Sequence, residues 1–361
     1  MPTSATSSAI NALTEVPPLC TAVLRLTYRA EGRVHLPSPP ANVWRGQLGY
    51  YLHRIASEEQ HERDRSLYQR LFRTPRSAVG VPDYGGGVLG PIGLAGEHVP
   101  HPFVVRLAEP PAPGTDHWME PGETVEVEMM LMGDTVAPLP QLTAAFEVVG
   151  EQGLGHRTEQ PSGTTERGRA VLTGAALALR GVTLSLYDGT DWALPPVCGP
   201  EFYERAAAIA PGENTETPPA AEPPLQVHFR TPVRLNHGNS PIRPEALNAD
   251  ALAAPLYRRV VGMAVCYGPE PPTAEVIQEM QEGFRALADP TALDISDLTW
   301  TEDTRYSHRQ ERRHPAGGLT GTLVIEAPPD LTDLWARWLH RAERIHLGKA
   351  TSMGLGRIEL G

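Results

Sequence analysis

A helix-like segment, a short Gly-x-Gly turn and a strand-like segment follow one another at two places in this chain. The first turn is Gly153–Leu154–Gly155, and the second is Gly354–Leu355–Gly356, close to the C-terminus. Around each turn, alternating apolar residues indicate strands and apolar residues at helical spacing indicate helices. Their order resembles the ferredoxin-like strand–helix–strand–strand–helix–strand unit. The sequence therefore predicts an α+β protein with two tandem ferredoxin-like (βαββαβ, RRM-like) domains.

Six segments of the first half carry this order. They are TAVLRLTYRA (21–30) as a strand, VWRGQLGYYLHRIASEE (43–59) as a helix, FVVRL (103–107) and ETVEVEMMLMG (123–133) as strands, LPQLTAAFEVVGEQ (139–152) as a helix, and GRAVLTGAAL (168–177) as a strand. The pattern is looser here than in the second half, because longer stretches separate the segments.

The second half repeats the order with one extra helix. Its segments are the strand LQVHFRTPVRL (225–235), the helices LYRRVVGMAVCY (256–267) and TAEVIQEMQEGFRAL (273–287), a hairpin of DLTWTEDTRYSHRQ (297–310) and LTGTLVIEA (319–327), the amphipathic helix DLTDLWARWLHRAERIH (330–346), and the strand GRIEL (356–360). A proline-rich stretch without apolar periodicity separates the halves. We expect an N-terminal extension over 1–20, domains over 21–210 and 225–361, and a linker over 211–224.

Composition excludes several classes of protein. The sequence contains no run of about 18 apolar residues, the length that a membrane-spanning helix needs. We also expect no signal peptide, because the N-terminus lacks a basic region followed by an apolar one. Cys20, Cys198 and Cys266 lie far apart and form no metal or disulfide pattern, which favours a cytoplasmic protein without metal or cofactor. A net charge of −12 argues against a globally basic nucleic-acid binder, although it leaves room for a local basic surface.

The glycine-rich segment GKATSMGLG (348–356) contains the single lysine, Lys349. It is not a phosphate loop of the nucleotide-binding type, because Ala350 follows the lysine and a helix precedes the segment. Two interpretations remain open. One is a tight helix-to-strand turn that needs glycines at positive φ. The other is a concave run of backbone N–H groups that holds a polyanion, flanked by Lys349, Thr351, Ser352 and Arg357.

The terminal segment HLGKATSMGLGRIEL (346–360) resembles the glycine-rich signature of CRISPR-associated RAMP proteins, and more narrowly of the endoribonucleases that process precursor crRNA. Further segments follow in the expected order, among them WRGQLGYYLHRI, LYQRLFRTP, PHPFVVRL, GEQGLGHR, FRTPVRL and GGLTG. The resemblance covers most of the chain from about residue 21, the linker excepted. Many relatives carry a cysteine cluster after the first helix, but ASEEQHERDRS has none, so no structural metal is expected there.

The resemblance implies metal-independent cleavage within a CRISPR repeat RNA. The 2′-hydroxyl next to the scissile phosphate attacks it and leaves a 2′,3′-cyclic phosphate and a 5′-hydroxyl. This reaction needs a base, an acid and fixed positive charge. The implied partners are the repeat RNA or crRNA and other subunits of a CRISPR effector complex, with no membrane and no direct DNA contact.

His53 is the first candidate for the base or acid. On a helical wheel, an apolar stripe that includes Trp44 and Leu48 leaves His53 on the opposite face with Gly46, Gly49 and Tyr50. The glycines there allow a backbone of protein or RNA to come close. Tyr50 could orient or donate a proton, whereas a solvated surface histidine is the plain alternative for His53.

Other residues complete the predicted site. His346, directly before the glycine-rich loop, is the second histidine candidate, although it could equally cap the preceding helix. His101 is expected to be structural. The RNA-binding residues are the basic side chains near the first helix, on the second hairpin and in the terminal loop, with the loop hydroxyls and its glycines: Arg45, Arg54, Arg305, Arg309, Arg312, Arg313, Lys349, Thr351, Ser352, Arg357, Gly348, Gly354 and Gly356.

Three functions remain open at this point. The first is the endoribonuclease, in which arginines replace histidine in some branches of the family. The second is a RAMP subunit that binds crRNA without cutting it. The third is a protein-interaction module that reuses the fold, against which the clustered arginines count.

Overall fold

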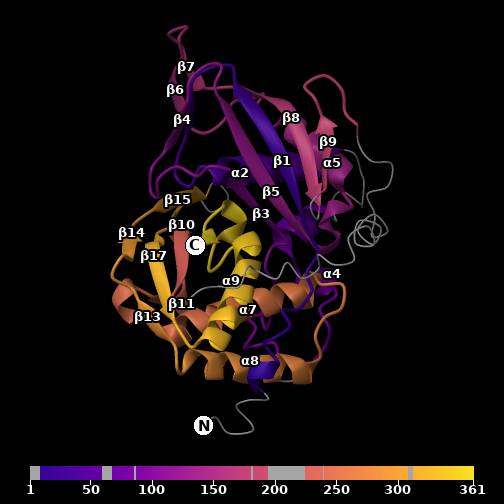
Figure 1. The fold of residues 1–361 in the computed structure, drawn as a ribbon. Coiled ribbons are helices and arrows are strands. Elements are labelled where there is room, and N and C mark those ends of the chain that lie inside the picture. The colour runs from indigo at the N-terminus through magenta and orange to yellow at the C-terminus, as the bar shows by residue number, and fades with distance from the viewer. Residues whose placement is uncertain are drawn as a thin grey trace.

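The computed structural model describes residues 9–58, 67–84, 87–179, 182–193, 224–238, 240–307 and 312–361. Nearly all of the expected linker lies outside these residues. Two five-stranded antiparallel sheets dominate the molecule, each covered by helices. In Figure 1 the first sheet lies in the upper part of the molecule and the second in the lower part.

The first sheet has the strand order β3-β5-β1-β8-β9. Its strands are β3 (Phe103–Leu107), β5 (Thr124–Met132), β1 (Thr21–Ala30), β8 (Ala170–Leu179) and β9 (Val182–Tyr187). Along β1 every second side chain is buried, as the alternation in the sequence predicts. With β9 set aside, the order is that of a ferredoxin-like sheet, in which the first strand pairs with the third and the fourth.

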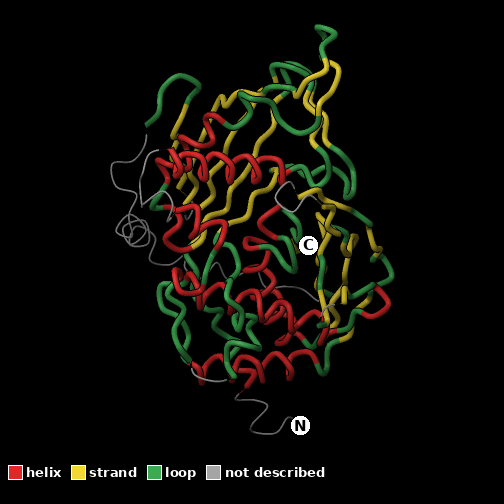
Figure 2. The backbone as a smooth tube through the Cα atoms, turned by 180° about the vertical axis from the view of Figure 1, so that it is seen from behind, coloured by secondary structure: helices red, strands yellow, loops and turns green. Residues whose placement is uncertain are grey.

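The helices α2 (Ala41–Glu58) and α5 (Leu139–Val148) pack together on this sheet, and Figure 2 shows helices lying across its strands. Trp44, Leu48 and Phe146 are fully buried in the core between them. Tyr28 of β1 donates a hydrogen bond to the carbonyl oxygen of Phe146 over 2.7 Å. The apolar stripe predicted for α2 is therefore the face that packs on the sheet.

The second sheet has the order β13-β17-β10-β18, with β14 also paired to β17. Its strands are β10 (Leu225–Val233), β13 (Ala292–Asp294), β14 (Thr299–Thr301), β17 (Gly318–Glu326) and β18 (Ile358–Leu360). Its helices are α7 (Ala249–Tyr267), α8 (Ala274–Ala288) and α9 (Pro329–Ile345). Here too the first strand lies between the third and the fourth, so both predicted ferredoxin-like units are confirmed, including the extra helix.

The α7 helix begins seven residues earlier than the sequence predicts. Asn248 caps it by accepting a hydrogen bond from the backbone N–H of Ala251, and Pro255 lies inside the helix. In α9 the predicted stripe is buried, including Trp335, Trp338 and Leu339.

Short elements connect the two sheets and project from them. The two-stranded pairs are β2 (Val34–Leu36) with β4 (His117–Met119), β6 (Arg157–Glu159) with β7 (Thr165–Arg167), β11 (Asn236–His237) with β12 (Ser240–Pro241), and β15 (Thr304–Ser307) with β16 (Arg312–Pro315). The short helical turns are η1 (Gln69–Arg73), α4 (Arg76–Val79), η2 (Gly133–Val136), η3 (Pro244–Ala246) and η4 (Thr351–Met353). The hairpin predicted in the second half is thus split into β14–β17 and the separate β15–β16 pair.

The two Gly-x-Gly turns occupy equivalent places, between α5 and β8 and between α9 and β18. All four glycines have positive φ values, between 65° and 87°. A Cβ atom on Gly155 would lie 1.9 Å from the carbonyl oxygen of His35, and one on Gly356 would lie 1.9 Å from that of Leu347. Both turns therefore require glycine for conformation and for space.

The N-terminal segment packs on the second unit rather than the first. Leu13 is fully buried, and its carbonyl oxygen accepts a hydrogen bond from Trp338 Nε1 over 2.9 Å. Arg341 donates to the carbonyl oxygen of Leu19 in the same way. These bonds tie the start of the chain to α9.

Candidate functional site

A groove of about 1460 Å³ follows the exposed side of α2. Most of its lining comes from the first unit, whereas Thr304 and Met353 reach it from the second. The arginine, histidine and aromatic side chains that line it are Arg45, Tyr50, Tyr51, His53, Tyr68, Phe72, Arg73, His101, His156, Arg157 and Arg167. Among the described residues that line it, none is an aspartate or glutamate. A chain of net charge −12 thus has a groove lined by four arginines and by no described carboxylate.

The helix α2 supplies the floor of this groove. Its exposed face carries Tyr50 and His53, opposite the buried Trp44 and Leu48. Gly49 is buried under the ring of Phe72, and a Cβ atom there would lie 2.9 Å from that ring. Gly46 is exposed and has no atom within 4 Å of its Cβ position. Gly49 therefore leaves space for the Phe72 ring, and Gly46 leaves space for a ligand in the groove.

His53 lies against a row of aromatic rings. Its imidazole meets the Tyr68 ring edge to face, with 5.0 Å between centroids and 80° between planes. Tyr68 in turn stacks on Phe72 at 5.5 Å. These rings come from the π-helical turn that includes η1, so two separate segments fix the position of the exposed histidine.

Arg45 connects the groove to the glycine-rich loop. Its Nε donates to Ser352 Oγ over 3.1 Å, and its terminal nitrogen donates to His101 Nε2 over 3.3 Å. The guanidinium lies over the Phe72 ring, 5.2 Å from the centroid. Burial and then the Arg45 charge lower the pKa of His101 to about 3, so this imidazole is neutral at ordinary pH.

The glycine-rich loop forms a packed joint between the two units. Thr351 and Ser352 are buried, and η4 packs against β3. A Cβ atom on Gly354 would lie 2.9 Å from the carbonyl oxygen of Val105. Of the predicted RNA-binding residues in the loop, Lys349 is exposed, while Met353 is the loop residue that lines the groove.

The backbone N–H groups of this loop bind the protein itself. Lys349 donates to the carbonyl oxygen of Arg234, Gly354 to that of Thr351, and Gly356 to that of Pro232, each over 3.0 Å. The open N–H cradle for a polyanion, one of the two interpretations of the sequence, does not match this geometry. The other interpretation, a glycine turn at positive φ, matches it.

His346 lies in the interior at the end of α9. It is fully buried, and its Nδ1 donates to the carbonyl oxygen of Leu355 over 2.9 Å. Burial first, and then the charge of Arg106, hold the pKa of this imidazole well below its usual value. The structure therefore places His346 at the end of α9, bonded to the glycine-rich loop and away from the groove.

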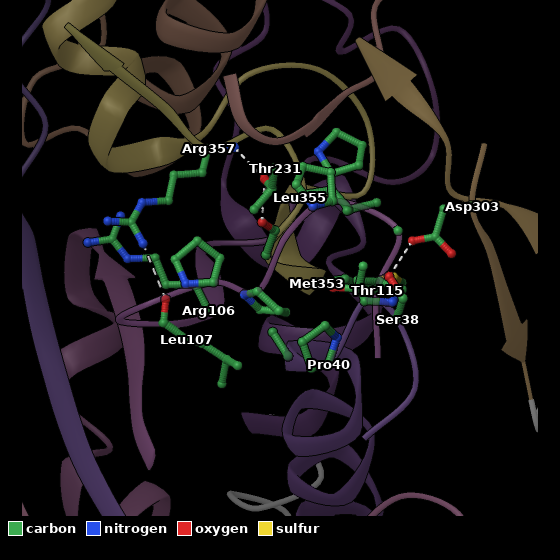
Figure 3. A pocket seen from close by; sticks show the side chains of 18 of the residues that line it. Ser38, Pro40, Arg106, Leu107, Thr115, Thr231, Asp303, Met353, Leu355 and Arg357 are labelled. Carbon is green, nitrogen blue, oxygen red and sulfur yellow. Dashed lines mark hydrogen bonds between the residues drawn. The ribbon is translucent and has the colours of Figure 1, made fainter. Parts of the chain in front are cut away.

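Arg357 also joins the two units, beside a small apolar cavity of about 40 Å³ (Figure 3). Its guanidinium donates to the carbonyl oxygens of Leu107 and Ala108 over 3.3 and 2.7 Å, and it pairs with Glu359. Ser38 donates to Asp303 on the other side of the cavity over 2.6 Å. The cavity is far smaller than a ligand pocket and lies in the joint between the units.

The remaining predicted residues belong to α2 and to the β15–β16 pair. Tyr50 is exposed on the floor of the groove, and Arg54 is exposed on the next turn of α2. Arg305, Arg312 and Arg313 belong to the β15–β16 pair, whose first residue, Thr304, lines the groove. Arg309 lies outside the described residues.

Sequence reasoning missed four basic residues of the groove. These are Arg73, His156, Arg157 and Arg167. A signal for two of them was present, since GLGHR (153–157) parallels GLGR (354–357) in the repeat. In the first unit the basic residues that follow the Gly-x-Gly turn line the groove. In the second unit the corresponding residue, Arg357, binds carbonyl oxygens between the two units instead.

A family model described as the CRISPR-associated endoribonuclease Cas6 matches residues 227–358. The matched part covers just over a third of the chain. It runs from β10 to β18 and so contains the glycine-rich loop, and it confirms the family resemblance found in the sequence. A second family model, described as an N-terminal domain, matches residues 19–181.

Several solved structures align with most of this chain. A partial Cas6-RT-Cas1–Cas2 complex aligns over 97% of this chain and 47% of the other, at 13% identity and a TM-score of 0.47. The chain thus spans about half of that relative's length. A Thermus thermophilus Cas6 aligns over 95% and 99%, at 14% identity and a TM-score of 0.43. A RAMP protein binding different RNA substrates aligns over 94% and 99%, at 7% identity and a TM-score of 0.42.

No significant match was found among curated proteins. Within the described residues, no three histidine, cysteine or acidic side chains gather as a metal site would require. No described helix has the length and apolar character needed to cross a membrane.

Proposed function

We propose that this protein is the endoribonuclease that processes precursor crRNA, cutting within the CRISPR repeat and passing the product to a CRISPR effector complex. The observation that carries the proposal is the groove itself. A chain that matches the Cas6 family model over residues 227–358 presents an exposed histidine, His53, in a basic groove whose described lining contains no carboxylate. Such a groove attracts the phosphates of RNA and leaves a proton-transfer group beside them.

The proposed reaction needs no group from outside the RNA and the protein. The 2′-oxygen forms a bond to the scissile phosphorus while the bond from phosphorus to the 5′-oxygen breaks. The 2′-hydroxyl proton passes to a base, and an acid supplies a proton to the departing 5′-oxygen. The products are a 2′,3′-cyclic phosphate and a 5′-hydroxyl.

We assign one of these proton transfers to His53. Its ring packs against Tyr68, and the residue is exposed on the floor of the groove proposed to hold the RNA. Tyr50, 56% exposed on the same groove floor, is the second proton-carrying candidate. His101 and His346 do not fit this role, because Arg45 donates to His101 Nε2 and His346 is fully buried.

Arg45 and Arg73 supply the positive charge for the phosphorane in this proposal. Both line the groove, and the contacts of Arg45 with Ser352 and Phe72 hold its guanidinium in place. Fixed donors stabilise developing charge better than donors that must reorganise.

The test uses the full chain and the repeat RNA of the CRISPR array in the source genome, with EDTA present. We expect one discrete cut, a 2′,3′-cyclic phosphate on the upstream product, and no cut when the nucleotide before the scissile phosphate is 2′-deoxy. Tight binding without a product would replace the proposal with the crRNA-binding subunit. Absence of both binding and cleavage would contradict an RNA function altogether.

A further inference from the structure

The β6–β7 hairpin places two arginines directly opposite each other at the edge of the groove. The register pairs Arg157 of β6 with Arg167 of β7, followed by Thr158 with Glu166 and Glu159 with Thr165. Arg157 and Arg167 are exposed, and both line the groove. In Figure 1 this hairpin projects from the top of the molecule.

A pair of like charges in this position opposes folding of the hairpin. Side chains directly opposite on antiparallel strands have Cβ atoms about 5 Å apart, and like charges there are destabilising. Within the part of the chain that the structure describes, neither Arg157 nor Arg167 has a carboxylate partner. The nearby Arg33 and Arg169, in contrast, pair with Glu120 and Glu31.

Hydrogen bonds hold the hairpin backbone at both ends, so the two strands keep Arg157 directly opposite Arg167. Gln160 is buried, accepts from the backbone N–H of Arg33 over 2.8 Å and donates to its carbonyl oxygen over 3.0 Å. Leu154 donates to the carbonyl oxygen of Gly168 over 2.8 Å. A Cβ atom on Gly153 would lie 2.5 Å from the Cβ of Arg167. The N-terminal Gly-x-Gly turn thus packs closely against β7, the strand that carries Arg167.

We propose that Arg157 and Arg167 bind two neighbouring phosphates of the RNA strand that occupies the groove, an inference that rests on the proposed function. Each guanidinium presents a planar set of donors that matches a phosphate. Two phosphates would neutralise two charges that repel each other in the free protein. The N-terminal unit would then bind the RNA through the hairpin that follows its Gly-x-Gly turn. The equivalent turn of the second unit instead packs between the two units.

The experiment compares the wild-type chain with the double variant Arg157→Ala, Arg167→Ala. The matched control is Arg169→Ala, which removes an arginine from the same segment but outside the groove lining. Binding of the labelled repeat RNA is measured over a series of salt concentrations, and the thermal midpoint of each RNA-free protein is measured at low salt.

We expect the double variant to bind RNA about tenfold or more weakly. Its salt slope should fall by about 1.4 if the bound segment is single-stranded and by about 1.8 if it is duplex. Its RNA-free midpoint should stay or rise, because repulsion is relieved. Arg169→Ala should keep the affinity and the slope of the wild type.

Three results would overturn the inference. In the first, the wild type binds and cuts the RNA, and the double variant binds it with the same affinity and the same salt slope. This result would exclude the arginine pair from RNA binding but would leave the proposed function intact. Arg169→Ala could weaken binding equally, which would indicate a general charge effect. The RNA-free double variant could melt lower, which would indicate a structural pair. A wild type without RNA binding would instead contradict the proposed function itself.

Discussion

Arg45 Nε donates a hydrogen bond to Ser352 Oγ over 3.1 Å, and this bond joins the first helix of one ferredoxin-like unit to the glycine-rich loop of the other. The same guanidinium lies over the Phe72 ring and faces the groove. The loop hydroxyl is therefore directed at a protein side chain. In this arrangement the glycine-rich loop supports the groove from behind, while α2 presents the groups that face it.

This relationship predicts a small effect of Ser352→Ala on RNA binding. The variant should lower the free energy of unfolding by about 1 kcal/mol, since one hydrogen bond is lost. Its affinity for the repeat RNA should stay within about twofold of wild type, because Arg45 still carries its charge. Urea denaturation and filter binding measure the two effects. A large loss of affinity with unchanged stability would make the hydroxyl a direct RNA ligand.

His53→Ala should reduce the single-turnover cleavage rate by about a hundredfold or more, while RNA affinity changes little. A positioned proton-transfer group contributes about that much to a rate. His237→Ala is the matched control, because His237 is exposed on β11 and does not line the groove. Normal cleavage by the His53 variant would move the chemistry to Tyr50 or the arginines.

Two glycine-to-alanine variants should have opposite effects on stability. Gly356→Ala places a Cβ atom 1.9 Å from the carbonyl oxygen of Leu347 at a φ of 78°, and should cost about 3 kcal/mol or more. Gly46→Ala meets no atom within 4 Å in α2 and should stabilise by about 0.5–1 kcal/mol.

The Gly46 variant also tests how closely the RNA approaches α2. Its Cβ atom would enter the groove, so the more stable protein should cut the repeat RNA more slowly. Thermal melts and cleavage rates of the same preparations decide this. Unchanged cleavage by a stabilised Gly46→Ala protein would show that the RNA does not contact this part of the helix.

Stability should fall as the pH drops below about 6.5. The folded protein lowers the pKa of His101 to about 3 and that of His346 well below its usual value, whereas both titrate near 6.5 once unfolded. Below that pH the unfolded chain binds more protons than the folded one, so protonation favours unfolding. Stability from these groups is complete above pH 6.5.

Urea midpoints between pH 7 and pH 5 measure this loss. His101→Gln should reduce the dependence on pH, because the glutamine side chain does not titrate. His237→Gln, at an exposed site, should retain the dependence of the wild type. Equal slopes for wild type and His101→Gln would contradict the role of His101.

The double variant Arg312→Ala, Arg313→Ala should bind the repeat RNA more weakly and with a shallower salt slope. Both positions lie on β16, next to the β15 strand whose first residue lines the groove. Each lost phosphate contact should lower the slope by about one. An unchanged slope would remove this hairpin from the RNA interface.

Local pattern was sufficient to predict most of the fold. The alternation in β1 and the stripe of Trp44 and Leu48 in α2 show which faces pack inward. The exposure of His53 and Tyr50 follows from the same wheel. These features depend on residues a few positions apart, so a single sequence reveals them.

The features that the sequence did not predict correctly depend on contacts between segments that are distant in the sequence. The backbone N–H groups near Gly354 are engaged by carbonyl oxygens of Pro232, Arg234 and Thr351, and no local pattern shows that β10 passes there. His346 looks accessible beside Lys349 until α9 and the loop close over it. Likewise, Arg157 and Arg167 come together through hairpin register, which spacing alone does not indicate.

The central claim is that RNA lies in the groove over α2, with the scissile phosphate at His53. Photo-cross-linking with 4-thiouridine beside the cleavage site, in a repeat RNA blocked by a 2′-deoxy nucleotide, tests it most directly. We predict cross-links on the α2 peptide that holds Tyr50 and His53, and their loss with excess unlabelled repeat RNA. Competed cross-links that fall only on other surfaces, such as the open face of either sheet, would contradict the account.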